Sequence, residues 1–144
     1  MADYFTHFSV AVRLHGKLAA AWVTDELRRR RKKRHELRDA GDDDAADEVG
    51  IDFEWIVEDG CFYAYDYGAT GSVEHVARFL QELIQLGYVQ DPIGIQWCES
   101  CSRPRPDSFT GGGVVVTGRK LYWFVVPELV EKKIDSLGRR RRQA

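Results

Sequence analysis

Residues 51–65 read IDFEWIVEDGCFYAY, and this stretch decides the fold class. Apolar side chains alternate with polar ones over 51–57, which is the pattern of a half-buried β-strand. Asp59-Gly60 then supplies a strong hairpin-turn signal, and 61–65 return as a second strand. Because a short turn joins antiparallel strands, the sequence predicts an antiparallel sheet that contains this hairpin.

The best-defined helix of the chain follows the hairpin. Ser72 has the side chain of an N-cap, and Glu74 lies in the first turn, where the helix dipole favours an acid. Gly87 lies where a C-terminal glycine belongs. Between these signals the apolar residues repeat at helical spacing, namely Val73, Val76, Ala77, Leu80, Leu83 and Ile84.

Similar patterns predict the remaining elements. Alternation indicates strands over 7–14, 93–97, 114–116 and 121–126. A helix is expected over 17–38 with an apolar stripe of Leu18, Ala21, Trp22, Val23 and Leu27, and Pro127 opens a closing helix that runs to about residue 137. We therefore predict an α+β two-layer sandwich: a mainly antiparallel sheet of five or six strands, two main helices on one face, and a short C-terminal helix.

Length and composition point to one domain. The chain has 144 residues, 44% of them hydrophobic, which excludes the disordered class. We expect a single domain over 1–138, in which 28–50 form a charged helix extension and an acidic linker, and a basic disordered tail over 139–144. With three cysteines, no signal-peptide pattern and no apolar run of ~20 residues, we expect a cytoplasmic protein without a membrane span.

Residues 97–113, WCESCSRPRPDSFTGGG, carry the most chemistry. We expect them to form a loop between two strands, and loops carry function more often than the scaffold beneath them. The predicted binding site comprises Trp97, Cys101, Ser102, Arg103, Arg105, Phe109, Gly111, Gly112 and Gly113.

Two interpretations of the arginines and glycines in this stretch remain open. Arg103 and Arg105 on a proline-stiffened segment suit bidentate contacts to a carboxylate or phosphate, and the glycines 111–113 let a backbone come close to a ligand. The alternative is a glycine bulge that enters an antiparallel strand, with the arginines paired to acids of the domain. Because prolines flank Arg105 on both sides, we expect it to be the structural anchor of the loop.

The pair Cys98 and Cys101 admits three interpretations. It could be half of a zinc site completed by Cys61 and a histidine, a redox pair, or one packed cysteine beside an incidental one. No second pair of ligands is spaced for zinc, and no helix begins at the pair to lower a thiol pKa. We favour the third interpretation and predict no catalytic residue, no metal and no cofactor.

Two further clusters suggest binding surfaces. The basic run comprises Arg28, Arg29, Arg30, Arg31, Lys32, Lys33 and Arg34, and Arg139 to Arg142 form a second one. Such runs bind nucleic acid through phosphates, although the acids over 42–48 could neutralise the first. The aromatic cluster lies on the 51–65 hairpin and just after it; if helices cover one sheet face, its outward members form an exposed patch. These residues are Trp55, Phe62, Tyr63, Tyr65 and Tyr67.

From Phe53 onward the chain resembles a group of small uncharacterised proteins encoded in bacterial and phage genomes. The likeness lies in the tryptophan-bearing strand at Trp97, the run Cys101-Ser102-Arg103-Pro104-Arg105, Phe109, the glycines 111–113, and the valine-rich strand that ends at Thr117. It includes the helix after Ser72 but neither the basic run nor Cys98. The resemblance implies a binding site and no reaction.

The function expected from these observations is a non-enzymatic protein-interaction or accessory module, related to phages or mobile elements, with a protein partner. The alternative is an accessory protein that binds nucleic acid through the basic runs. A third hypothesis is an enzyme with Cys101 as nucleophile and Arg105 holding an anionic substrate.

Overall fold

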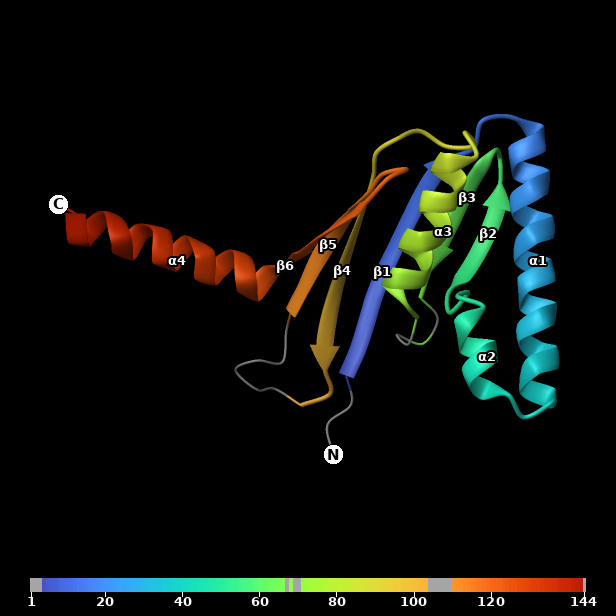
Figure 1. Cartoon of the computed structure of the whole chain (residues 1–144), viewed down its shortest axis with the longest axis horizontal. Coiled ribbons are helices and arrows are strands. Elements are labelled where there is room, and N and C mark those ends of the chain that lie inside the picture. The colour runs from blue at the N-terminus through green and yellow to red at the C-terminus, as the bar shows by residue number, and fades with distance from the viewer. Residues whose placement is uncertain (1–3, 67, 69–70, 104–109, 144) are drawn as a thin grey trace.

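A computed structural model describes residues 4–66, 68, 71–103 and 110–143 (Figure 1). It confirms the predicted α+β fold with an antiparallel sheet. The elements, in chain order, are β1 (Tyr4–Arg13), α1 (Lys17–Asp39), α2 (Asp43–Glu48), β2 (Glu54–Glu58), β3 (Cys61–Tyr65), α3 (Val73–Gln85), β4 (Ile93–Cys101), β5 (Thr110–Val116), β6 (Leu121–Val125) and α4 (Val126–Gln143).

The six strands form one sheet in the order β2-β3-β1-β4-β5-β6, and every neighbouring pair is antiparallel. Because side chains alternate along a strand, each strand sends every second residue toward the helices. Phe62, Ala64, Ile95, Val114 and Val116 are buried there, in one core with residues of α1 and α3. Both main helices therefore cover the same face of the sheet, as predicted.

Phe79 of α3 lies at the centre of this core and is 1% exposed. Its ring stacks on Trp22 of α1 with 6.4 Å between centroids, and it meets Phe62 of β3 edge to face at 5.5 Å. Phe53, just before β2, contacts the same ring at 6.2 Å. One side chain thus joins both helices to the β2–β3 half of the sheet.

The ends of α3 agree with the sequence signals. The Ser72 side chain accepts a hydrogen bond from the His75 backbone N–H at 3.2 Å, so it caps the helix. Gly87, just past the last turn, has φ of 75°, a conformation that glycine adopts without steric cost. In α1, by contrast, the predicted stripe is shifted, because Leu18 is exposed and the buried residues are Ala19, Val23 and Leu27.

Three segments differ from the sequence prediction. The prediction of an acidic linker is wrong in part, because residues 43–48 form α2, which packs against α1. The Asp42 side chain caps α2 by accepting a hydrogen bond from the Ala45 N–H at 3.1 Å. The prediction of a disordered tail is also wrong, because α4 continues to Gln143 and spans 18 residues. The third is the stretch 97–113, where β4 continues to Cys101 and β5 already begins at Thr110, so the strands extend further into it than predicted.

None of the helices within the described ranges is both long enough and apolar enough to cross a bilayer.

Candidate functional site

The glycines of the predicted site lie in a regular β-ladder. Across β4 and β5, Trp97 pairs with Gly112, Cys98 with Gly111 and Gln96 with Gly113, in one unbroken register. The bulge considered from sequence is therefore wrong. The glycines also lack the positive φ that would require glycine, so another cause must explain why three occur in a row.

That cause is the close approach of neighbouring atoms. A Cβ at Gly111 would lie 2.6 Å from the Trp97 carbonyl oxygen. A Cβ at Gly112 would collide with the Phe124 carbonyl oxygen and would lie 2.8 Å from the Trp97 indole. The Trp97 ring therefore lies directly against Gly112. The protein's own atoms fill the space beside this glycine that a ligand would need for close contact with the backbone.

Trp97 also lines a groove on the helix side of the sheet. The Trp97 and Trp123 rings meet edge to face with 5.7 Å between centroids. A cavity of about 450 Å³ opens beside them at the N-terminal end of α3, and we call it the tryptophan groove. It is lined by Thr6, Gly71, Val73, Glu74, Trp97, Glu99 and Trp123.

The sequence pattern anticipated only Trp97 among the lining residues. Alternation along β4 places Glu99 on the same face as Trp97, so the sequence alone could have indicated Glu99 as a lining residue. Thr6 and Glu74 enter the groove only because β1 lies beside β4 and α3 crosses them, and no local pattern contains that information.

The two cysteines of the Cys-x-x-Cys pair lie three residues apart on β4. Residues at that spacing on a strand point to opposite faces of a sheet. Cys98 is exposed opposite His7 of β1, whereas Cys101 is half-buried beside Tyr4 in the register. Such a pair does not form the knuckle of a zinc site, and no metal-binding cluster of three His, Cys, Asp or Glu is found among the described residues.

Ser100, His7 and Asp66 form a chain of polar contacts that the sequence did not reveal. The Ser100 Oγ lies 3.4 Å from the His7 Nε2, and the His7 Nδ1 lies 3.7 Å from an Asp66 oxygen. Asp66 also accepts a hydrogen bond from the Phe8 N–H at 2.9 Å. These side chains have the order of a hydrolase triad, but both gaps exceed the ~2.6–3.2 Å of a catalytic hydrogen bond, and neither Ser100 nor His7 lines the tryptophan groove.

The rest of the predicted site is divided between described and undescribed residues. Ser102 and Arg103 follow β4 and are exposed. Arg105 and Phe109 lie outside the described residues, so the anion site and the anchoring role of Arg105 stay predictions.

The sheet face opposite the helices carries the outward aromatic residues. Paired residues share a face, and the pairs Ile56–Tyr63, Val115–Tyr122 and Gly113–Phe124 all lie on this one. Small or polar residues separate the two groups at the middle of the sheet. We call this surface the open face; among its residues are Ser9, Ala11, Ile56, Tyr63, Tyr65, Gly94, Gln96, Gly113, Val115, Tyr122 and Phe124. The same registers place the charged or polar residues His7, Arg13, Glu54, Glu58 and Ser100 on this side as well.

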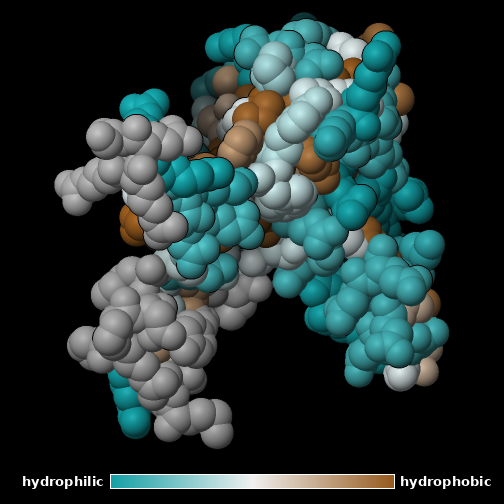
Figure 2. All heavy atoms as spheres, turned by 60° about the vertical axis from the view of Figure 1, so that its left-hand side comes forward, coloured by the Kyte–Doolittle hydropathy of each residue, from teal (hydrophilic) through white to brown (hydrophobic). Residues whose placement is uncertain are grey.

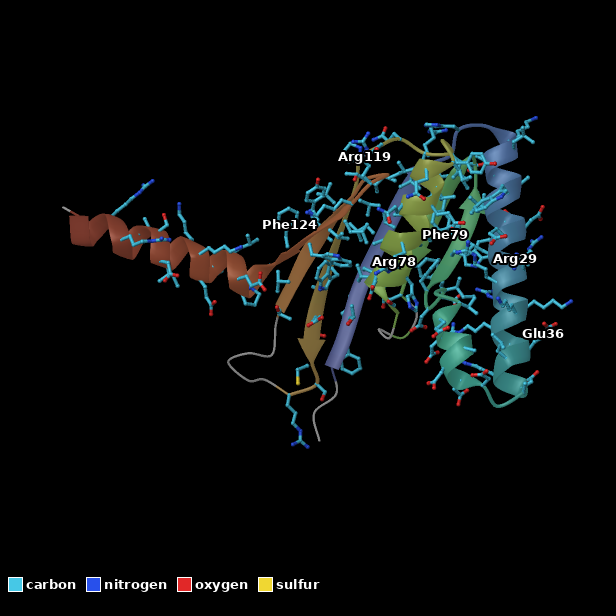
Figure 3. All side chains as sticks on the ribbon, in the orientation of Figure 1. Arg29, Glu36, Arg78, Phe79, Arg119 and Phe124 are labelled. Atoms are coloured by element: carbon cyan, nitrogen blue, oxygen red, sulfur yellow. The ribbon has the colours of Figure 1, made fainter. Side chains whose placement is uncertain are left out.

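The open face is accessible, as expected for a sheet that helices cover on one side. Ile56, Tyr63, Tyr122 and Phe124 are each between 39% and 46% exposed. Figure 3 labels Phe124 on β6 and Phe79 on α3, in the helix layer. Of the predicted aromatic cluster, Tyr63 and Tyr65 belong to this face, whereas Trp55 and Phe62 pack toward the helices; Tyr67 lies outside the described residues.

The basic run on α1 is largely neutralised, but not by the acids that the sequence suggested. Arg30 lies 2.8 Å from Glu26 and 2.7 Å from Glu82 of α3, and its guanidinium lies over the Phe79 ring. The other pairs within 4 Å are Arg29 with Glu26, Arg31 with Glu54, Lys32 with Glu36 and Arg34 with Asp52. Of the acids over 42–48, Asp47 pairs with Arg38 at 3.4 Å.

Glu26 is the most strongly perturbed acid of this network. Hydrogen bonds from the Arg29 side chain, and then from Arg30, lower the pKa of Glu26 from its ordinary value of 4.5 to about 2. The side chains of Glu26 and Arg30 are 16% and 18% exposed, so solvent screens that contact little, whereas Arg29 is 61% exposed and its contact is screened more. The α1 run therefore contributes to stability and is not a free cationic surface along its whole length.

Comparisons of this chain with protein-family models, with curated proteins and with solved structures found no match. The resemblance to the bacterial and phage group therefore stays an expectation.

Gly112→Ala tests the close packing under Trp97. We expect the free energy of unfolding to fall by about 1–3 kcal/mol, because the new methyl group must displace a backbone carbonyl and an indole ring. Gly94→Ala is the matched control on the same sheet, since nothing lies within 4 Å of the position that its methyl group would occupy. Urea melts should show the control unchanged or stabilised by up to ~1 kcal/mol; equal losses in both variants would contradict the packing argument.

Glu26→Gln tests the charged network. A lowered pKa in the folded state means that the ionised form stabilises the fold above pH 4.5, and that this contribution disappears as the pH falls toward 2. We expect a loss of about 2 kcal/mol at pH 7 in urea melts, and a smaller difference from the parent at pH 3. Glu36→Gln, at an exposed pair, should change stability by less than about 0.5 kcal/mol. A Glu26→Gln deficit that does not depend on pH would refute the assignment.

Proposed function

We propose that the protein is a non-enzymatic interaction module that binds a partner protein on its open face. The observation that carries the proposal is the position of the helices: α1 and α3 both pack on one side of the sheet, and the other side presents Ile56, Tyr63, Tyr122 and Phe124 to solvent. Exposed apolar patches mark contact sites in soluble proteins, and this side carries two of them, Ile56 with Tyr63 and Tyr122 with Phe124.

The composition of the open face supports a particular kind of partner. The aromatic residues lie on β3 and β6, and the strands between them contribute Ser9, Ala11, Gly94 and Gly113. Small residues let a partner approach the sheet closely, while the rings on either side supply buried area. We therefore propose that the partner presents one helix with an apolar stripe, which lies over the small residues between the rings.

The cellular setting is part of the same proposal. The three cysteines Cys61, Cys98 and Cys101 are unpaired, which suits the reducing cytoplasm. The resemblance to bacterial and phage proteins adds the expectation of an accessory role related to phages or mobile elements. A small module with one apolar docking face fits such a role.

The nucleic-acid alternative has less support. Five members of the first basic run lie within 4 Å of a carboxylate. Figure 1 shows α1 at one end of the molecule and the C-terminal end of α4 at the other, so the two basic runs do not form one surface. Any binding that uses one run alone should be weak and should be lost steeply with salt.

A photo-crosslinking residue in place of Tyr63 tests the proposal in the native host. We expect it to capture a defined protein, and the same residue in place of Arg78, an exposed position on α3, to leave that protein uncaptured. With the captured partner purified, Phe124→Ala should weaken binding at least about tenfold, as at an aromatic hot spot. Arg119→Ala, in the β5–β6 turn of the same hairpin, is the control.

Two results would contradict the proposal. One is identical capture from Tyr63 and Arg78, which would indicate non-specific contact. The other is an affinity that Phe124→Ala leaves unchanged, which would place the partner on another surface.

A further inference from the structure

The apolar side chains of α4 are about half exposed in the single chain. The helix begins at Val126, directly after β6, contacts β5 and β6, and then extends away from the body (Figure 1). Five apolar side chains along it are each 47–62% exposed, namely Val126, Leu129, Val130, Ile134 and Leu137. At 100° per residue they form a single stripe about 17 Å long.

The face of α4 that carries this stripe is basic toward its C-terminal end. At 100° per residue Lys133 lies within the stripe and Arg140 continues it, while Lys132 lies on one flank and Glu131 on the other. Figure 2 turns this side of the molecule forward and shows hydrophobic side chains exposed among hydrophilic ones. A surface that receives α4 must therefore be apolar with acidic groups at its edge.

The tryptophan groove has this chemistry. Trp97 and Trp123 form its apolar wall, and Glu74 and Glu99 line it as acids. It lies on the helix side of the sheet, at the N-terminal end of α3. A helix placed there would extend the helix layer.

The chain's own α4 does not reach this groove in the structure. No residue separates β6 from α4, and Trp123 precedes the helix by only three positions, so the helix leaves the sheet in the direction that β6 gives it. A second copy of the chain meets no such constraint. In a two-fold dimer each α4 would lie in the other copy's groove, and both contacts would form together.

We propose that α4 docks in the tryptophan groove of a second copy, so that the protein is a dimer with exchanged C-terminal helices. Val130 and Ile134 would contact the partner's tryptophans, and the lysines and arginines would lie near Glu74 and Glu99. Glu74 also pairs with Arg78 at 2.8 Å, so Glu99 supplies the stronger attraction. The dimer uses the helix side of the sheet and leaves the open face accessible, so this inference does not depend on the proposed function.

Light scattering coupled to size exclusion tests the association. We expect the full chain to be a dimer at about 100 µM, a concentration that detects even a standard free energy of about −5.5 kcal/mol. Val130→Ser/Ile134→Ser should shift the dissociation constant at least about tenfold toward monomer. Glu128→Ser/Asp135→Ser places two serines on the side of α4 opposite the stripe, removes none of its apolar side chains, and should leave the dimer intact. Circular dichroism of each variant verifies that the domain is folded.

Crosslinking tests the place of docking. In a background with Cys61, Cys98 and Cys101 replaced by serine, one protein carries Ile134→Cys and a second carries Glu74→Cys. A short bis-maleimide should join the two proteins when they are mixed, whereas Gln96→Cys on the open face should not react with Ile134→Cys. A monomeric parent, a dimer that survives Val130→Ser/Ile134→Ser, or a crosslink to position 96 in place of 74 would each overturn the proposal.

Discussion

The ring of Phe79 is the contact on which the architecture depends. It stacks on Trp22 of α1, meets Phe62 of β3 edge to face, and contacts Phe53 before β2, while the Arg30 guanidinium lies over it. These contacts fix α1 and α3 on one side of the sheet. The same packing leaves the other side of the sheet away from α1 and α3, and the open face is the consequence.

The charged network covers the side of this core that faces solvent. Arg30 is 18% exposed and pairs with Glu26 on its own helix and with Glu82 on α3, so it joins the two helices above Phe79. The basic run, which in the sequence suggests a site for a polyanion, thus serves in part to join α1 to α3. Other residues of the run face solvent; the Lys32 side chain, for example, is 80% exposed.

Local patterns predicted the elements well where one signal dominated. The alternation over 51–65 gave the β2–β3 hairpin, and Ser72 and Gly87 gave both ends of α3. The pattern failed at the glycines 111–113, because glycine favours loops in isolation. The Trp97 carbonyl beside Gly111, and the Trp97 ring and Phe124 carbonyl beside Gly112, explain why glycine occurs in this strand. The pattern failed also at 43–48, where Asp42 caps a helix too short to show an apolar stripe. The groove and the Ser100–His7–Asp66 chain could not be predicted, since both need β1 beside β4.

Hydroxyl-radical footprinting of the free protein and of its complex with the captured partner tests the central claim, that one sheet face is open and binds. We predict that Tyr63, Tyr122 and Phe124 are modified in the free protein and protected in the complex, while Trp22 and Tyr88, which contact each other in the helix layer, react equally in both states. Protection of the three open-face residues in the free protein would contradict this claim, as would partner-dependent protection confined to the helix layer.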